Sequence, residues 1–344
     1  MVGTAISLFA FSSQQSMACA TCGCTLTTDW GTQGVSNYEG LSIDVRYDYV
    51  NQNMLRQGNS GISGQQASQA TNVKIGTPAE VEQYTRSSYI TTAIDYNQGD
   101  SWGVTATIPY VSRVHSTYGS YGAGADPYPA PGDGAYNSQG SSVGDMRLVA
   151  RYYGFAEQKN WGLQLGIKAP TGQFNQTAVF SSTDGTSQKQ LVDPGLQAGS
   201  GSWDSIIGAY KYGFINDRED WGYFSQILFQ SSFRNSSTPS GYANSGTYRP
   251  GNGMSVNLGV NYQGVSWINP TVQINYLYKQ SDSGSAGDAF ATGGNIAYLT
   301  PGFIIPVQKK VQIYGNVQLP VYQNVYGIQL VPSYIASGGV RVMF

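Results

Sequence analysis

Residues 334–344 read Tyr-Ile-Ala-Ser-Gly-Gly-Val-Arg-Val-Met-Phe, and the sequence ends on the aromatic side chain of Phe344. Side chains alternate between the two faces of a β-strand, so every second residue of this stretch shares a face. One face carries Val340 and Phe344, whereas the other carries Ser337 and Arg341. A strand that is apolar on one face and polar on the other suits a barrel wall between lipid and a polar lumen.

The same alternation recurs along the chain from about residue 41. Leu41, Val45 and Tyr49 share one face of the first such segment, and Asp44 and Arg46 share the other. Period-two alternation of this kind predicts half-buried strands. The twelve predicted strands cover residues 41–54, 84–97, 102–115, 142–155, 160–172, 203–214, 220–234, 253–263, 266–280, 293–306, 309–321 and 327–344.

Short and long connections alternate between these strands. The short polar turns are at 97–100, 156–159, 216–219, 263–265 and 307–308, and the long Gly-, Ser- and Asn-rich segments are at 55–83, 116–141, 173–202, 235–252 and 281–292. This rhythm predicts an all-β, transmembrane, antiparallel up-and-down β-barrel of about twelve strands, with periplasmic turns and extracellular loops. A soluble β-sandwich is the alternative, but its strands are usually only about five or six residues long.

The composition excludes several other classes of protein. Only 11% of the 344 residues are charged, 44 are Gly and 26 are Tyr. The mean hydropathy is −0.27, and beyond the N-terminus no run of about 20 apolar residues predicts a helical membrane protein. A net charge of −2 gives no support for a nucleic-acid partner.

The N-terminal residues resemble a secretory signal. An apolar stretch at 2–11 is followed by Ala18-Cys19-Ala20, which fits a small-x-small cleavage site. We therefore expect a signal peptide at 1–20, a Cys-containing periplasmic extension at 21–40 and the barrel at 41–344, in the outer membrane of a Gram-negative bacterium. Lipidation of Cys19 is the alternative, although Ser16-Met17-Ala18 lacks the Leu that usually opens a lipobox.

Charged residues of the predicted strands are confined to the face opposite the apolar one. Because charge in lipid is costly, we expect these side chains to face the lumen. The predicted basic lumen residues are Arg46, Arg113, Arg147, Arg151, Lys168, Lys211, Lys279 and Arg341, and the acidic ones are Asp44, Asp48, Asp95 and Asp145. Two interpretations stay open: the charges pair across strands and brace the barrel, or their basic excess selects anionic solutes.

The cysteines form one cluster before the first strand. Cys19, Cys22 and Cys24 are the only three in the chain, within Cys-Ala-Thr-Cys-Gly-Cys. Cys-x-x-Cys occurs in redox pairs and in zinc sites. We expect no bound cofactor, unless Cys22 and Cys24 hold a metal or form a disulfide, or contact a periplasmic partner protein.

His115 is the only histidine and is predicted near the outer end of a strand. An outer-membrane phospholipase or protease needs a catalytic group beside such a histidine. The nearest candidates are Thr117, on the same face, and Asp126 and Asp133 in the following Pro- and Gly-rich loop. These residues form no recognisable catalytic set, so we predict that the chain is not an enzyme.

Two segments carry a family resemblance. Lys168-Ala-Pro-Thr-Gly172 ends one strand, and Asp193-Pro-Gly begins a Gly-rich stretch that leads to Tyr210. Together they resemble a family of outer-membrane barrel transporters associated with phenol degradation by the meta pathway and related to porins. The resemblance implies outer-membrane transport. The closing strand also resembles that of bacterial outer-membrane barrels, whose terminal Phe is read by the barrel-assembly machinery.

We therefore expect a porin-like channel for passive passage of small solutes, either anionic or aromatic, constricted by the outer loop at 119–140. The expected partners are outer-membrane lipid, the assembly machinery and, if the cysteines act, a periplasmic protein. One alternative is a barrel anchor or sleeve that docks a periplasmic redox or metal-binding partner through Cys22 and Cys24. Another is a surface filament or adhesin subunit, suggested by the Tyr- and Ser-rich loops.

Overall fold

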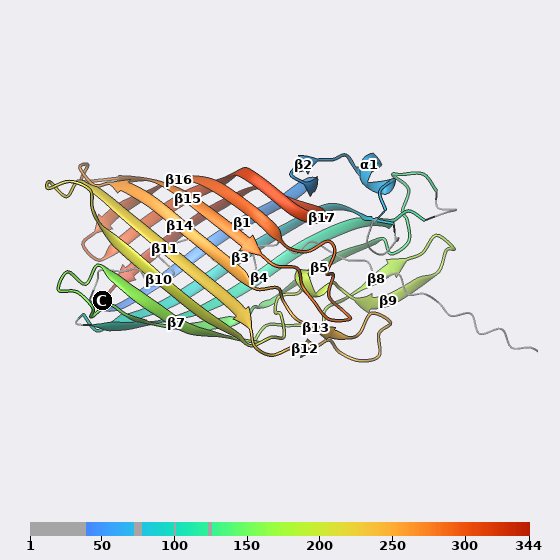
Figure 1. Ribbon diagram of the computed structural model, residues 1–344, viewed down its shortest axis with the longest axis horizontal. Coiled ribbons are helices and arrows are strands. Elements are labelled where there is room, and N and C mark those ends of the chain that lie inside the picture. The colour runs from blue at the N-terminus through green and yellow to red at the C-terminus, as the bar shows by residue number, and fades with distance from the viewer. Residues whose placement is uncertain (1–38, 72–77, 100, 123–125) are drawn as a thin grey trace, which may run out of the picture.

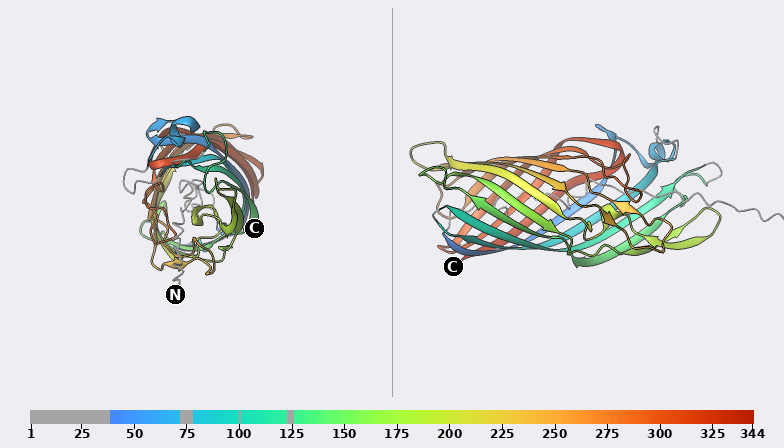
Figure 2. Two further views of the ribbon diagram at one scale, coloured as in Figure 1. Left: turned by 90° about the vertical axis from the view of Figure 1, so that its right-hand side faces the viewer. Right: turned by 60° about the horizontal axis from the view of Figure 1, so that its bottom comes forward.

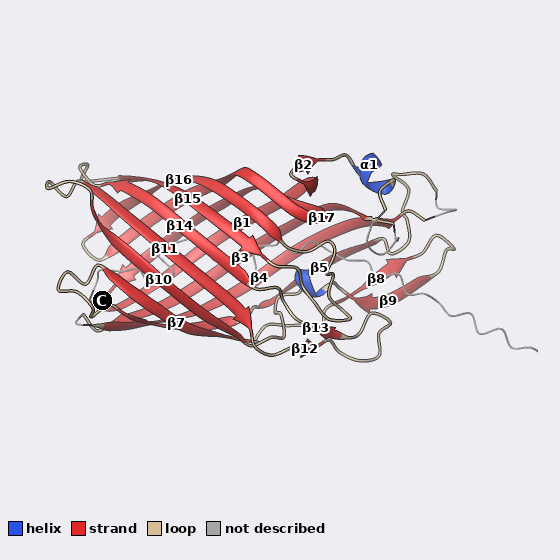
Figure 3. Cartoon of the chain, in the orientation of Figure 1, coloured by secondary structure: helices blue, strands red, loops and turns tan. Residues whose placement is uncertain are grey.

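The structure is a computed structural model that describes residues 39–71, 78–99, 101–122 and 126–344. The predicted signal peptide and nearly all of the predicted extension lie outside these residues. Within the described ranges, no helix has the length and apolar character needed to cross a membrane. Strands and loops make up almost the whole described chain, with short helical turns at α1 (Gly64–Ser68) and η1 (Pro194–Leu196) (Figure 3).

The described chain forms one closed antiparallel β-barrel (Figure 1). Its eleven strands are β1 (Gly40–Gly58), β3 (Glu80–Asn97), β4 (Trp102–Ser120), β6 (Met146–Tyr152), β7 (Trp161–Ala169), β10 (Asp204–Phe214), β11 (Trp221–Ser232), β14 (Gly253–Tyr262), β15 (Asn269–Lys279), β16 (Gly294–Gln308) and β17 (Val311–Met343). Neighbours along the chain pair antiparallel, and β17 pairs with β1 to close the ring, which Figure 2 shows end-on. Two further strands of the sheet, β2 (Ser60–Gly61) and β5 (Tyr136–Val143), lie outside this closed path.

The last element, β17, turns back on itself. Its first part, up to Val325, pairs with β16, and the part from Val325 onward pairs with β1. The backbone N–H of Met343 donates to the carbonyl of Lys310 at 2.8 Å, so the two ends of this element lie side by side. It thus covers both of the last two predicted strands, and the predicted number of about twelve is close.

The predicted strand at 142–155 is broken in the structure. Here β5 pairs with residues 110–117 of β4, and β6 pairs with residues 102–107 of the same strand. Gly144 and Asp145 lie between β5 and β6. Asp145 leaves the strand pattern because its carboxylate accepts hydrogen bonds from the backbone of Gly172 and Ser200, at 3.1 and 2.9 Å. Hydrogen bonds of the Asp145 side chain therefore take the place of β-sheet pairing at this residue.

The predicted alternation of faces is present in the barrel wall. Val45 is 45% exposed and Phe344 is 57% exposed, whereas Asp44 between two outward residues is 3% exposed. Exposed apolar side chains cover the outer surface, and Trp102 and Trp221 lie just after short turns. Aromatic residues at that level are typical of the girdle at a membrane interface.

The long connections gather at the end of the barrel opposite the C-terminus (Figure 1). They contain two small hairpins, β8 (Thr177–Ser181) with β9 (Ser187–Leu191) and β12 (Ser236–Ser237) with β13 (Thr247–Tyr248). An apolar core of buried side chains holds the first hairpin against the barrel strands. Its members are Tyr136, Phe180, Val192, Leu196 and Leu330.

Candidate functional site

The predicted lumen charges of β1 form ion pairs within the inner wall. Arg341 contacts Asp44 at 3.2 Å, and Asp44 also accepts a hydrogen bond from Tyr314 at 2.7 Å. Two residues further along β1, Arg46 donates to Asp48 at 2.8 Å. All four charged side chains are at most 12% exposed, so these contacts are far less screened than surface pairs.

A second pair joins strands that are not neighbours. Arg151 on β6 donates to both carboxylate oxygens of Asp95 on β3, at 2.5 and 2.9 Å. Thr105 on the intervening β4 donates to the same carboxylate at 2.5 Å. The guanidinium crosses β4 at Gly103, where an added Cβ would lie 2.6 Å from the Arg151 Cζ. The glycine thus makes room for a fork-shaped ion pair, the strongest kind of charge-assisted hydrogen bond.

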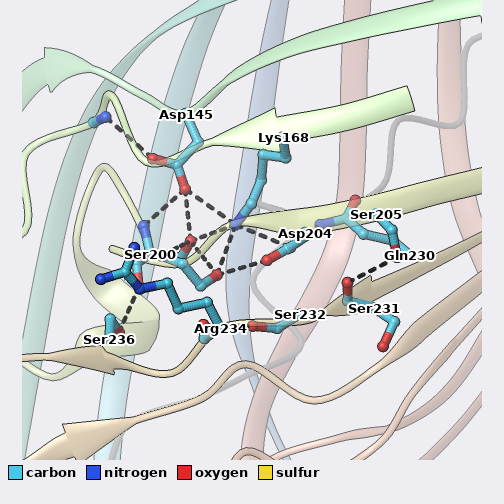
Figure 4. A network of polar contacts seen from close by, with 12 residues as sticks. Asp145, Lys168, Ser200, Asp204, Ser205, Gln230, Ser231, Ser232, Arg234 and Ser236 are labelled. Carbon is cyan, nitrogen blue, oxygen red and sulfur yellow. Dashed lines mark hydrogen bonds and ion pairs between the residues drawn. The ribbon is translucent and has the colours of Figure 1, made fainter.

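Lys168 forms the centre of a polar network at the outer ends of β6, β7 and β10 (Figure 4). Its Nζ lies 3.1 Å from Asp145 and 3.0 Å from Asp204, and it donates to Ser200 and, at 3.2 Å, to Ser202. The lysine side chain is 2% exposed, and the carboxylates are 9% and 3% exposed. One buried cation therefore joins two buried carboxylates, Asp145 between β5 and β6 and Asp204 on β10.

Between the ion pairs of Lys168 and Lys279, the inner face of β7, β11, β14 and β15 carries neutral amides. Gln226 donates to Gln164 at 3.0 Å across β10, where Gly208 has no side chain to block the contact. Asn275 donates to the amide oxygen of Asn257 at 2.9 Å. The inner wall thus has one ionic part and one uncharged, hydrogen-bonding part.

Most predicted lumen charges are found facing inward. Lys279 pairs with Asp282 at 2.8 Å, and Arg147 lies on the inward side of β6, half-buried. Arg113 is 5% exposed and donates to Ser87 at 2.8 Å and to the Tyr89 hydroxyl at 2.7 Å. These contacts support the bracing interpretation.

The prediction that Lys211 faces the lumen is wrong, because Lys211 is exposed on the outer face of β10. It pairs with the exposed Trp161 on β7, whereas the buried Ile206 and Tyr210 occupy the inward positions. Adjacent isoleucines at 206 and 207 put an apolar residue on each face, so the alternation there was ambiguous. The lysine lies beside an interfacial tryptophan, where an outward cation costs little.

The sequence reasoning also missed acidic partners. Asp204 binds Lys168, and Asp282 binds Lys279. Asp204 shares the inward face with the buried Tyr210, and the alternation of side chains from Tyr210 therefore predicts Asp204 in the lumen. Removing Lys211 from the lumen and adding two aspartates cancels most of the predicted basic excess.

The 3-10 turn η1 lies against the inner wall at the outer end of the barrel, at a position in the chain after the predicted constriction at 119–140. Arg113 donates to the carbonyls of Gly195 and Gln197, both at 3.3 Å, and so holds η1 against the inner wall. Leu196 between them is buried in the apolar core with Phe180. From the predicted segment only Tyr136 belongs to that core.

The end of the barrel with the short turns, which we expect to face the periplasm, holds a cavity of about 930 Å³. Its apolar lining includes Tyr153, Tyr210, Tyr212 and Phe224, which project inward from the strands near the short turns. The Tyr210 and Tyr212 rings are nearly parallel, with centroids 6.3 Å apart. The rest of the lining is rich in amides, and this size is typical of a pocket for a small molecule.

The remaining candidate groups are the cysteines and His115. Cys22 and Cys24 lie outside them. His115 is fully buried, with its Nδ1 2.8 Å from the Thr85 hydroxyl and its ring 5.2 Å from that of Tyr136. Across the described ranges, no three His, Cys, Asp or Glu side chains are grouped so that they could hold a metal.

Comparison with known proteins matches the fold alone. No protein-family model and no curated protein matches the sequence. Among solved structures, the COG4313 outer membrane channel from Pseudomonas putida F1 superposes with a TM-score of 0.60 at 11% identity, covering 89% of this chain and 96% of the other. The β domain of the Bordetella autotransporter BrkA gives 0.48 at 12% identity, covering 89% and 100%, and the Ralstonia pickettii toluene transporter TbuX gives 0.47 at 11%, covering 95% of each.

The chain therefore has the fold of a bacterial outer-membrane β-barrel. Its exposed apolar belt and its aromatic girdle agree with a lipid surround, and they place the barrel in the outer membrane.

Proposed function

We propose that the chain is an outer-membrane channel for passive passage of small solutes, and that it favours aromatic, hydrogen-bonding solutes over anions. The observation that carries the proposal is the periplasmic cavity of about 930 Å³, which is lined by inward-facing tyrosines and amides. Aromatic rings and amides together recognise a solute that is flat on one side and polar at its edge. A phenol is the narrower candidate, favoured by the resemblance of the segments around Lys168 and Asp193.

The ion pairs argue against strong selection by charge. A fixed cation that contacts a carboxylate at about 3 Å presents little net field to a passing anion. The lumen cations with such a partner are Arg46, Arg151, Lys168, Lys279 and Arg341. Their role in this proposal is to brace the wall, which leaves the uncharged wall and the cavity to set the preference.

Swelling of proteoliposomes tests the proposal with two matched solutes, phenyl β-glucoside and phenyl β-glucuronide. They share the ring and the sugar frame and differ by one carboxylate. We expect the neutral glycoside to enter at least as fast as the anion, and Tyr210→Ala to change the two rates unequally. Entry of the glucuronide at ten times the rate of the glucoside would overturn the preference, and no swelling with either would overturn the channel.

The anchor and adhesin alternatives stay predictions. The groups on which the anchor depends, Cys22 and Cys24, lie outside the described residues.

A further inference from the structure

We infer that the cavity at the short-turn end of the barrel holds a saccharide subsite. In this subsite the Tyr212 ring packs against the flat face of a neutral pyranose ring, and the amides of Asn261 and Gln263 bind the sugar hydroxyls. The inference rests on the proposed function and deepens it, because it names the hydrogen-bonding part of the solute as a sugar ring. Three observations carry it: a fixed aromatic ring, two amides without partners, and a balance of charge around the cavity.

The Tyr212 ring is held in place on the cavity wall. Its hydroxyl donates to the carbonyl of Lys159 at 2.8 Å, and its ring lies nearly parallel to that of Tyr210. Tyr210 is 4% exposed, whereas Tyr212 is only half-buried and belongs to the cavity lining. The flat face of a pyranose carries C–H groups, which leave water when they pack on an aromatic ring. A ring that is already ordered loses little freedom when such a ligand binds.

Two amide side chains meet over Gly222 on the same wall. Asn261 pairs with Gly222 across β11 and β14, and a Cβ added at Gly222 would touch the Asn261 amide oxygen and lie 3.1 Å from the Gln263 amide nitrogen. Tyr212 pairs with Phe224, two residues further along β11, so only that strand separates the aromatic ring from the amides.

These two amides are free to bind a ligand. No group in the described part of the chain forms a hydrogen bond with the side chain of Asn261 or Gln263. An amide both donates and accepts, as a sugar hydroxyl does, so neighbouring hydroxyls of one pyranose match the pair. A simple phenol has a single hydroxyl and leaves at least one of the amides without a partner.

The charges around the cavity favour a neutral ligand. Arg341 in the lining already contacts Asp44 at 3.2 Å. The other charged residues of the lining are two of each sign, Lys159, Lys309, Glu39 and Glu219. Because neither sign is in excess, the cavity has no net attraction for an anion or a cation, and hydrogen bonds and ring contacts decide what it binds.

The first test measures binding of neutral disaccharides to the folded full-length barrel in a sugar-free detergent, by saturation-transfer NMR. Maltose, cellobiose and lactose are the probes. Sorbitol is the matched control, because it has hydroxyls but no ring face. We expect saturable binding of at least one disaccharide, with upfield shifts of protons on one face of a pyranose, and no saturable binding of sorbitol. Failure of all three disaccharides to bind, or equal binding of sorbitol, would overturn the inference.

Variants test the assigned residues. Tyr212→Ala should weaken binding about tenfold and remove the upfield shifts, whereas Tyr212→Phe keeps the ring and should retain both. Asn261→Leu keeps the size of the side chain and should weaken binding at least about threefold. Tyr262→Ala is the matched control, because Tyr262 packs on the exposed Trp221 outside the lumen, 5.0 Å between ring centroids, and should leave the affinity unchanged.

All variants are compared as folded, heat-modifiable protein. Unchanged binding in Tyr212→Ala, or equal losses in Tyr212→Ala and Tyr262→Ala, would overturn the assignment of the ring.

Swelling of proteoliposomes separates this inference from the channel proposal. Entry of phenyl β-glucoside without saturable binding of any disaccharide overturns the subsite and leaves the channel intact. Saturable disaccharide binding to a barrel that gives no swelling supports the subsite and overturns the channel.

Discussion

Replacing Lys168 by methionine tests whether the buried charges brace the barrel. Lys168 is 2% exposed and holds Asp145 at 3.1 Å and Asp204 at 3.0 Å. Methionine keeps the unbranched length of the side chain but leaves both carboxylates without their cation. Breaking a buried ion pair by removing one partner costs about 3–5 kcal/mol. We expect the lower end of that range, about 3 kcal/mol, because Asp145 keeps backbone hydrogen bonds from Gly172 and Ser200.

The measurement is reversible urea unfolding of the refolded barrel in lipid vesicles, followed by tryptophan fluorescence. The triple variant Asp145→Asn, Lys168→Met, Asp204→Asn is the matched control, because it removes the charges together. Neutral replacement of a whole buried ionic group is often neutral or stabilising, so we expect the triple variant to recover most of the loss. A loss below about 1 kcal/mol for Lys168→Met, or no recovery in the triple variant, would refute the bracing argument.

Three further variants test other parts of the account. Replacing Leu165, which is 63% exposed on the outer face, by Arg should lower the free energy of unfolding by about 2–4 kcal/mol. The control Lys211→Arg should have no effect. Equal costs of the two changes would contradict the assignment of faces. Gly208→Val places a Cβ 2.3 Å from the Leu228 side chain, beside the contact of Gln164 with Gln226. The variant should lower the free energy of unfolding by about 1–3 kcal/mol in the same assay. No loss of stability would contradict the packing across β10. Burial alone would raise the pKa of Asp133, but hydrogen bonds from Thr183 and Ser182 outweigh it and lower that pKa below its ordinary 3.8. The outer-loop contact is therefore formed above about pH 3.8 and weakens as the pH falls through the lowered value. The rate at which pepsin cuts the β8–β9 hairpin, divided by its rate on an unfolded substrate at the same pH, should rise at the acid end, and Asp133→Ala should remove that rise. A ratio that does not change with pH in the unaltered protein would contradict this expectation.

The architecture was readable from the sequence because the membrane imposes it. Lipid on one side and a polar interior on the other force period-two alternation, which placed Asp44, Arg46 and Asp95 inward. The alternation failed where both faces are apolar, as at Ile206 and Ile207, and this put Lys211 on the wrong side. It also gave no sign that β5 and β6 are separate, because the break at Asp145 depends on partners from a distant loop.

The contacts that define the lumen were less predictable. Pairing of Arg151 with Asp95 spans three strands and depends on the absence of a side chain at Gly103. Binding of η1 by Arg113 depends on how a long loop folds back, and loop paths follow from tertiary contacts rather than from local periodicity. The sequence therefore predicts which charges face inward more reliably than which partners they meet.

Single-channel recording in planar lipid bilayers tests the central claim most directly. The sample is the folded, heat-modifiable full-length barrel. The account predicts discrete conductance steps with a permeability ratio for small anions and cations near one. Folded protein that inserts and gives no steps would contradict the channel, and strong anion selectivity would contradict the paired lumen.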